Sequence, residues 1–145
     1  MIRQPKKSKK NDFTGICVIG VIGYKKYVLY SKSVKLSPRK LEQFIINVND
    51  KFEPNEIVKE GNIEAKLTED LKARGLPIED VWTHNDKYTR LLGISGLIEV
   101  GDTYFLNKGQ DNLIEQITNY PDTEHDDEQD AFVIGMTRAQ QWIED

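Results

Sequence analysis

Hydrophobic and polar residues follow two periods along this chain, one typical of strands and one typical of helices. Residues 15–23 form a β-branched apolar run that is too short for a buried helix, so it predicts a strand. A second run, at 27–31, predicts another strand after a turn at 24–26. Together they predict an antiparallel β-hairpin near the start of the chain.

A helical pattern follows the hairpin. Ser37 supplies a typical N-cap and Pro38 suits the first helical position, so the helix is predicted to begin there and to end before Pro54. Its apolar face is formed by residues at helical spacing: Leu41, Phe44, Ile45 and Val48. This spacing predicts an amphipathic helix with one apolar face.

Short strands and helices alternate through the rest of the chain. Strands are predicted at 56–60, at 81–83 and, after a hairpin-type turn at 101–102, at 103–106. Helices are predicted from 61 to 74, through Arg90 to Leu97, at 112–118 and at 126–142, with Phe132, Met136, Ala139 and Ile143 as the last apolar stripe. A hairpin followed by this alternation favours a mixed α/β domain, with the strand that ends at Glu60 in the hairpin's sheet.

Length and composition restrict the class of protein. The 145 residues suit a single domain, and 38% hydrophobic with 30% charged residues is typical of a globular chain. Cys17 is the single cysteine, which excludes an internal disulfide and a cysteine-only zinc site. No apolar run approaches the roughly 20 residues of a membrane span, and no signal peptide is evident. We therefore expect a soluble, cytoplasmic protein with no membrane partner.

Charge is distributed unevenly, although the net charge is only -4. Five of the first ten residues are cations, and six of the nine residues at 122–130 are carboxylates. We divide the chain into a basic arm at 1–11 and a single domain at 12–145. Net acidity argues against a general nucleic-acid coat protein, yet Lys9 and Lys10 could contact a phosphate backbone locally. A solvated tail is the simpler interpretation of the arm alone.

Glu60 is the first candidate site residue. It ends an apolar strand just before Gly61, and open α/β sheets keep their sites where strands turn into helices. An ordinary exposed glutamate at a strand end is the competing interpretation.

The acidic start of the last helix is the second candidate. Asp127 and Asp130 are three residues apart, on one face of the helix, directly before its apolar stripe. Carboxylates at the edge of a core repel one another unless a cation intervenes, and Mg²⁺ and Mn²⁺ prefer such oxygen ligands. Spacing alone favours metal binding and simple N-terminal capping equally.

Lys87 and Arg90 are the third candidate, in a polar stretch at 86–90. Both could contact phosphate groups. A solvated helix start is the competing interpretation.

Taken in order, these segments resemble the C-terminal nuclease domain of phage terminase large subunits. The resemblance covers nearly the whole chain, in stretches at 11–15, 57–60, 86–90, 97–105, 113–121 and 125–131. The last stretch, His-Asp-Asp-Glu-Gln-Asp-Ala, is the most specific, because the family often has His-Asp-Asp followed by Asp-Ala at this spacing.

This resemblance implies a ribonuclease H-like fold, a mixed sheet flanked by helices, and metal-dependent cutting of double-stranded viral DNA during genome packaging. Glu60 matches the family's middle metal ligand. The family's late carboxylate, on the last helix, matches Asp127 or the neighbouring Asp126, and Asp127 is our first choice. Asp130 would play a supporting role. The implied cofactors are Mg²⁺ or Mn²⁺, two ions when the ligand set is full, and two-metal chemistry leads us to expect Glu60 and Asp127 within about 4–8 Å. The implied partners are the terminase motor domain and the portal, in the cytoplasm of a bacterial host.

Two departures from the family pattern limit these expectations. The phosphate-binding Gly-x-x-x-x-Gly-Lys-Ser/Thr loop of the motor does not occur. The family's first catalytic Asp would fall at residues 2–4, which read Ile-Arg-Gln, so the first, central strand of the fold is cut short. Three explanations stay open: a fragment of a longer terminase, a degenerate site, or partial recruitment of Asp12.

Activity of this chain is therefore left open, with a nuclease as the leading hypothesis. The alternative is a catalytically degenerate form of the same fold that serves as a DNA-binding or packaging-complex-binding module. An unrelated α/β domain with capped helices is a third interpretation.

Overall fold

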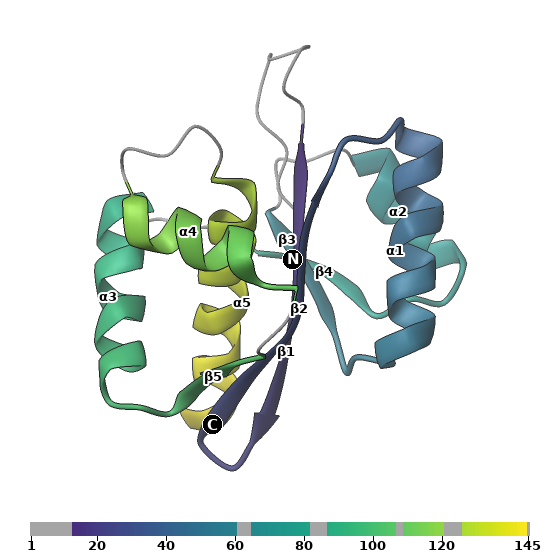
Figure 1. The fold of residues 1–145 in the computed structure, drawn as a ribbon. Helices are drawn as coiled ribbons and strands as arrows, with labels where there is room; N and C mark the ends of the chain where they lie inside the picture. Colours follow the sequence, from purple (N-terminus) through teal and green to yellow (C-terminus); the bar gives the residue numbers. More distant parts are fainter. Residues whose placement is uncertain (1–12, 61–64, 82–86, 107–108, 121–125, 145) are drawn as a thin grey trace.

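Two small β-sheets occupy the middle of the molecule, between two groups of helices (Figure 1). The computed structural model describes residues 13–60, 65–81, 87–106, 109–120 and 126–144; the side chains of Glu60, Lys87, Tyr88 and Arg90 are not described. The strands are β1 (Thr14–Ile22), β2 (Lys25–Val34), β3 (Ile57–Glu60), β4 (Ile78–Val81) and β5 (Thr103–Phe105). The helices are α1 (Pro38–Phe52), α2 (Ala65–Ala73), α3 (Lys87–Glu99), α4 (Asp111–Asn119) and α5 (Asp127–Glu144).

The predicted hairpin is confirmed. β1 and β2 pair antiparallel from Thr14 opposite Val34 to Ile22 opposite Lys25, with a register shift between Val18 and Ile19. β5 then pairs parallel to β2. The hairpin-type turn predicted at 101–102 is therefore wrong: Gly101, at a φ of 85°, ends α3 and leads into β5. A glycine with positive φ is as typical of a helix end as of a hairpin.

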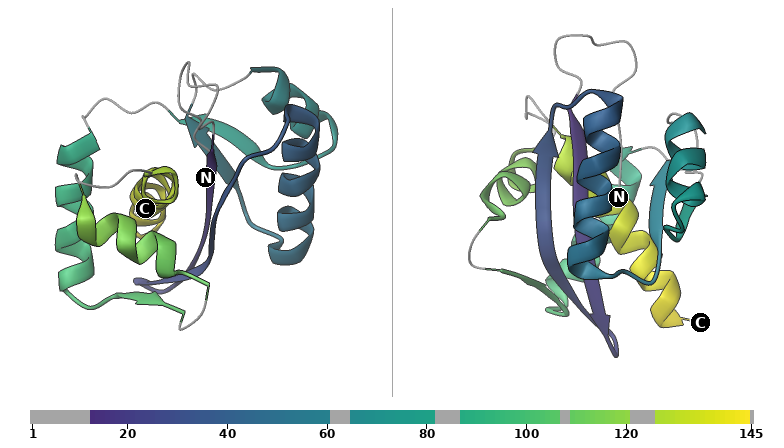
Figure 2. Two further views of the ribbon diagram at one scale, coloured as in Figure 1. Left: turned by 45° about the horizontal axis from the view of Figure 1, so that its top comes forward. Right: turned by 90° about the vertical axis from the view of Figure 1, so that its right-hand side faces the viewer.

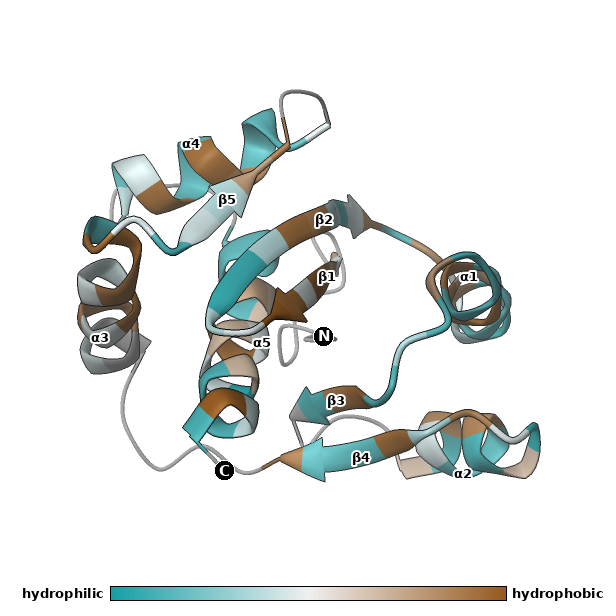
Figure 3. Cartoon of the chain, turned by 90° about the horizontal axis from the view of Figure 1, so that it is seen from below, coloured by the Kyte–Doolittle hydropathy of each residue, from teal (hydrophilic) through white to brown (hydrophobic). Residues whose placement is uncertain are grey.

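The strand that ends at Glu60 lies in a separate sheet, which corrects the single-sheet prediction. β3 and β4 pair parallel, from Ile57 opposite Ile78 to Glu60 opposite Val81. The larger sheet has the order β5–β2–β1 (Figure 3). Within the described residues no strand lies between β1 and β3, so their facing edges form no ladder. The strand predicted at 81–83 overlaps β4 at Val81, and the rest of that prediction lies outside the described residues.

Strand alternation divides the apolar residues into two cores, one on each face of the sheets. Ile16 and Ile57 pack with Leu41, Ile45 and other residues around α1 and α2. Their neighbours in sequence, Cys17 and Val58, belong to a second core shared with α3, α4 and α5. Period-two alternation explains the division, because successive strand residues point to opposite faces. The helices form the two outer layers accordingly (Figure 2).

Helix ends follow the sequence signals closely. The Ser37 side chain accepts a hydrogen bond from the Lys40 amide at 3.5 Å, and Pro38 opens α1 as predicted. The helix ends at Phe52, and Glu53 follows in a left-handed conformation before Pro54. The predicted start of the second helix, at 61–62, lies outside the described residues. No helix in the described ranges is both long and apolar enough to cross a membrane.

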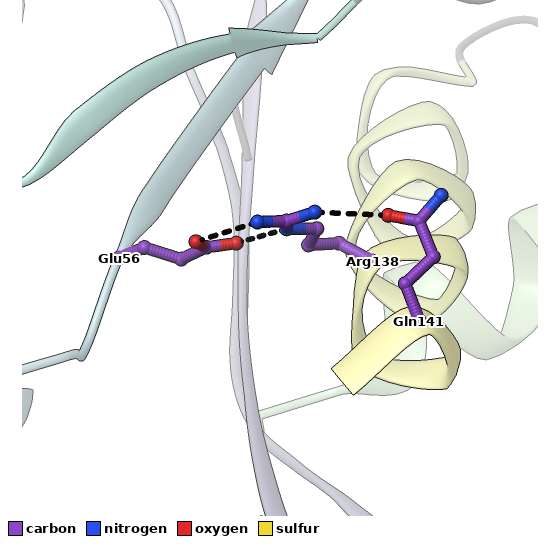
Figure 4. A network of polar contacts seen from close by, with 3 residues as sticks. All are labelled: Glu56, Arg138 and Gln141. Atoms are coloured by element: carbon purple, nitrogen blue, oxygen red, sulfur yellow. Dashed lines mark hydrogen bonds and ion pairs between the residues drawn. The ribbon is translucent and has the colours of Figure 1, made fainter. Parts of the chain in front are cut away.

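An ion pair joins the smaller sheet to α5 (Figure 4). Arg138 of α5 donates from both Nε and Nη2 to the carboxylate of Glu56, which directly precedes β3, and Nη1 donates to Gln141 Oε1 at 3.1 Å. These bonds from Arg138 hold the pKa of Glu56 below its usual value, although partial burial opposes the shift. The bidentate geometry makes this pair stronger than an ordinary surface contact.

Glu56→Gln is expected to reduce the free energy of unfolding by about 1 kcal/mol at pH 7, because Arg138 is partly exposed and solvent screens the pair. A depressed carboxyl pKa stabilises the fold above the unfolded value of about 4.3, and this contribution is lost as pH falls through the folded value. Chemical denaturation at several pH values should therefore show the difference between wild type and variant shrinking below about pH 5.

Asp70→Asn is the matched control, because it removes the exposed Lys66–Asp70 pair within α2. Its effect should stay within about 0.5 kcal/mol. An equal loss in both variants would contradict the role given to Glu56.

Candidate functional site

The first turn of α5 carries three acidic residues that are withdrawn from solvent. Asp127, Glu128 and Asp130 are only 4%, 1% and 6% exposed. Ionised side chains are almost never this buried unless other groups compensate for the lost hydration. The acidic start of the last helix is therefore part of the interior, whereas an ordinary cap would be solvated.

Glu128 is held by the hairpin. Its carboxylate accepts hydrogen bonds from Ser31 Oγ at 2.5 Å and Ser33 Oγ at 3.4 Å, both on β2. Burial raises the pKa of the Tyr30 hydroxyl, and the nearby charge of Glu128 adds to the shift. Burial likewise raises the pKa of Cys17 to about 12, so this cysteine is a neutral thiol in the core.

Backbone contact between β1 and α5 fixes this arrangement. A Cβ atom at Gly15 would lie 2.0 Å from the carbonyl oxygen of Asp127 and 2.8 Å from the amide nitrogen of Glu128. Only glycine allows so close an approach. From the other side, Gln116 Oε1 in α4 accepts from the Gln129 amide at 3.0 Å, which satisfies one free donor of the helix start.

Gln129 adds an unusual feature to this turn. The residue is fully buried, and among the described residues neither Oε1 nor Nε2 of its side chain has a hydrogen-bond partner. A buried amide without partners costs free energy. Gln129 is therefore held by packing and by its backbone amide, and its side chain adds no hydrogen bond among the described residues.

β3 brings Glu60 to the end of the smaller sheet, where its backbone lies opposite Val81. The preceding residue, Lys59, is fully buried, and its Nζ lies 2.7 Å from the carboxylate of Asp80 on β4. These two residues are register partners, which explains how the pair forms. A buried cation thus precedes Glu60 directly.

The structure brings some predicted site residues together and leaves others undecided. Asp127 and Asp130 lie in one helical turn, and the half-buried Asp126 precedes it, its carbonyl accepting from the Asp130 amide at 2.8 Å. Among the described side chains, no three His, Cys, Asp or Glu residues have the geometry of a metal site. The Glu60 side chain lies outside that description, so the expected distance from Glu60 to Asp127 stays a prediction.

The predicted DNA contacts stay predictions as well. Lys87 and Arg90 fall in the first turn of α3, although their side chains are not described. Lys9, Lys10 and Asp12 lie outside the described residues.

Sequence reasoning missed three features of this region: the burial of Glu128, the Lys59–Asp80 pair and the Glu56–Arg138 pair. Two signals could have pointed to them. Ser31 and Ser33 are two apart on one face of β2, which is a pattern of hydroxyls facing a buried acceptor. Lys59 follows the two apolar residues of β3, Ile57 and Val58, and a lysine buried in a strand requires a partner.

Comparison with known protein families identifies the chain. The family model of the terminase RNaseH-like domain matches residues 5–138. The chain belongs to this family. No curated protein matches the chain significantly.

The helices and strands described above are therefore those of a terminase RNaseH-like domain. The mixed α/β architecture agrees with the predicted fold class, and the match includes β1, the strand end at Glu60 and the acidic turn of α5. The family supports a nuclease-type domain of a terminase.

Gly15→Ala is expected to lower the free energy of unfolding by about 2 kcal/mol or more, because its new Cβ would collide with the Asp127 backbone. Thermal denaturation measures the loss. Gly20→Ala on the same strand is the control, since its Cβ would meet only the flexible Leu29 side chain at 3.2 Å. If both variants unfolded at the same temperature, the close contact would not be a constraint.

Proposed function

We propose that this terminase RNaseH-like domain is a divalent-metal-dependent nuclease domain for double-stranded DNA. In this proposal Glu60 and Asp127 supply part of the ligand set, with Asp126 beside Asp127 and Asp130 in support. The observation that carries the proposal is the burial of Asp127 and Asp130 at the start of α5. Buried carboxylates at a helix start are poorly hydrated, and their oxygen atoms are the ligands that a hard divalent cation prefers.

The packing of β3 against α5 supports the proposal that Glu60 lies near this turn. Val58, two residues before Glu60, belongs to the same buried core as Ala131 and Phe132 of α5. Period-two alternation assigns residue 60 to the same face of β3 as residue 58. We therefore expect the Glu60 carboxylate to approach the first turn of α5.

The donor set fits the implied metals, since every proposed ligand atom is a carboxylate oxygen. Bound Mg²⁺ or Mn²⁺ would activate a water molecule and stabilise the leaving oxygen of a phosphodiester. Neighbouring residues fix the turn that carries the proposed ligands: Gly15 allows the close approach of the α5 backbone, and Ser31 and Ser33 bind Glu128.

DNA contacts in this proposal come from Lys87 and Arg90 at the start of α3 and from Lys9 and Lys10 of the basic arm. Contacts of this kind position a duplex without reading its sequence. The motor domain and portal of a packaging machine are the proposed protein partners, and the cytoplasm of a bacterial host is the proposed location.

A second function is favoured by one specific observation. Residues 2–4 read Ile-Arg-Gln and offer no carboxylate where the family's first catalytic Asp would fall. A domain without that ligand would serve as a DNA-binding or packaging-complex-binding module. The two functions share the fold and differ in catalysis.

Millimolar Mn²⁺ is expected to raise Tm, because an ion that binds only the folded state stabilises it. Glu60→Ala and Asp127→Asn should each abolish the increase in differential scanning calorimetry. Glu79→Ala, at an exposed position of β4, is the control and should keep it. An increase that survives in Glu60→Ala and Asp127→Asn would place the ion elsewhere, and no increase in wild type would remove the metal site.

DNA cleavage by the 145-residue chain is expected to be very weak in a plasmid-nicking assay, because a missing ligand leaves one ion poorly fixed. Adding an upstream strand that bears an Asp should produce Mn²⁺-dependent nicking, and Asp127→Asn in the extended protein should remove it. Strong cleavage by the unextended chain that persists in an Asp126→Asn, Asp127→Asn double variant would falsify this assignment of the site.

A further inference from the structure

The hairpin of β1 and β2 combines basic and aromatic residues. Residues 13–36 contain no carboxylate, although the chain has a net charge of -4. They contain three tyrosines and four lysines in an interleaved order: Tyr24, Lys25, Lys26, Tyr27, Tyr30, Lys32 and Lys35. Cations interleaved with aromatic rings are typical of surfaces that bind nucleic acid, provided that both are exposed on one face.

Two tyrosine rings stack on the sheet near the turn of the hairpin. Tyr27 of β2 and Tyr104 of β5 are register partners, and their ring centroids lie 5.1 Å apart with an interplanar angle of 18°. The Nζ atom of Lys25 lies 6.0 Å from the centroid of the Tyr104 ring. β5 is the outer strand of its sheet, so no described strand covers the side of Tyr104 that faces away from Tyr27. An aromatic ring and a cation are therefore presented together.

Strand alternation places this pair on the face of the sheet that is opposite α5. Val28 and Phe105, which follow Tyr27 and Tyr104 in sequence, belong to the core around α5. Successive strand residues point to opposite faces, so the two tyrosines point away from that core. We call the surface around them the tyrosine face. It consists of Ile22, Lys25, Tyr27, Leu29 and Tyr104.

The tyrosine face is open to solvent. Tyr104 is 41% exposed and Leu29 37%, and Ile22, two residues after Gly20 on β1, is 71% exposed. Gly20 lies opposite Tyr27 and has no side chain, so Leu29 extends over it. Helix α1 packs nearer the other end of the hairpin, where Phe52 contacts Tyr30 at 5.7 Å between ring centroids, and the hairpin extends beyond the end of α1 (Figure 2).

This surface is separate from the acidic turn of α5. The turn contacts β1 at Gly15, whereas the tyrosine face begins near Ile22 at the other end of the same strand. Seven residues of extended strand correspond to about 20–25 Å. A ligand on the tyrosine face would therefore not occupy the proposed metal site.

Charge and ring geometry indicate which ligand suits this surface. Lys25 and Lys32 are both exposed, and Lys32 shares the face because it lies opposite Ile16, a residue of the core around α1. The two lysines are about 20 Å apart along β2, with Tyr27 and Leu29 between them. Unpaired bases can stack on such rings while their phosphates contact the lysines. The bases of a duplex are already stacked on one another and are accessible only at their edges, in the grooves.

We propose that the tyrosine face is a docking surface for single-stranded DNA. Bases stack on Tyr104 and pack against Leu29 and Ile22, and the phosphates contact Lys25 and Lys32. The binding is independent of base sequence, because every base has a face that can stack. The choice of DNA over RNA rests on the proposed nuclease function, whereas the stacking surface itself does not.

Fluorescence anisotropy with a labelled oligothymidine of about ten nucleotides tests the proposal. EDTA is present, so neither a metal ion nor cleavage contributes, and the result is separate from that of the nuclease proposal. Tyr104→Ala should raise Kd about tenfold, the loss expected for one stacked base. Tyr104→Phe keeps the ring and should bind like wild type. Tyr104→Leu, which keeps apolar packing without a ring, should also weaken binding and serves if the alanine variant does not fold.

The contribution of charge is tested by salt dependence. Lys25→Gln should weaken binding and reduce the slope of log Kd against log salt concentration by about 0.7, the value for one phosphate contact with a single strand. Lys72→Gln, at an exposed position of α2, is the matched control and should change neither. Trp142→Ala removes an exposed aromatic ring from α5, which packs on the other face of the sheet, and should leave Kd unchanged.

A measurement on the unaltered protein locates the contact. An oligonucleotide in which 5-iodouracil replaces thymine forms a cross-link under ultraviolet light with an aromatic side chain stacked on the base. Mass spectrometry should find the cross-link at Tyr104 or Tyr27. Unlabelled duplex DNA of the same length should compete about tenfold less effectively than the single strand.

Four results would overturn the proposal. The first is an unchanged Kd in folded Tyr104→Ala, Tyr104→Leu and Lys25→Gln variants. The second is a cross-link confined to residues outside the tyrosine face. The third is competition by duplex DNA, or by oligouridine RNA, that exceeds competition by single-stranded DNA. The fourth is a dimer in sedimentation without DNA that is lost in Tyr104→Leu, which would make a second copy of the chain the occupant.

Discussion

Backbone contact between Gly15 of β1 and the first turn of α5 is the constraint on which the arrangement of the acidic residues depends. The contact pulls the helix start against the hairpin, so three acidic side chains become buried in one turn. Two serines of β2 satisfy Glu128, and Gln116 of α4 satisfies the amide of Gln129. Burial that would otherwise be unfavourable is therefore tolerated because neighbouring elements supply hydrogen-bond donors and acceptors.

α5 also connects the two halves of the molecule. It packs on β1 and β2 of the larger sheet and contacts β3 of the smaller one. Val58 joins its core, and Arg138 binds Glu56 at the start of β3. Because β1 and β3 do not pair, these contacts with α5 hold the smaller sheet beside the larger one. The proposed site lies at the first turn of α5, and the later turns of the same helix line a cavity together with β1 and β3.

Much of the fold could be predicted because its signals are local. Ser37 and Pro38 mark the start of α1, and the β-branched run of β1 predicts a strand without any tertiary information. The division into two sheets could not be predicted, because it depends on which strand edges meet, and Ile57 and Val58 look equally buried in either arrangement. The burial of Glu128 also escaped prediction, since it is decided by Ser31 and Ser33 almost a hundred residues away. Family membership follows from an ordered set of motifs, whereas the role of Glu60 depends on a distance that no sequence pattern supplies.

The central claim is that Glu60 and Asp127 hold one metal site at the start of α5. Anomalous diffraction from a crystal soaked in Mn²⁺ tests it most directly, because the signal locates the ion independently of the protein atoms. The account predicts a manganese peak within bonding distance, about 2.0–2.2 Å, of a carboxylate oxygen from each residue. A peak bound by other residues, or a Glu60 carboxylate directed away from Asp127 in the soaked crystal, would contradict it.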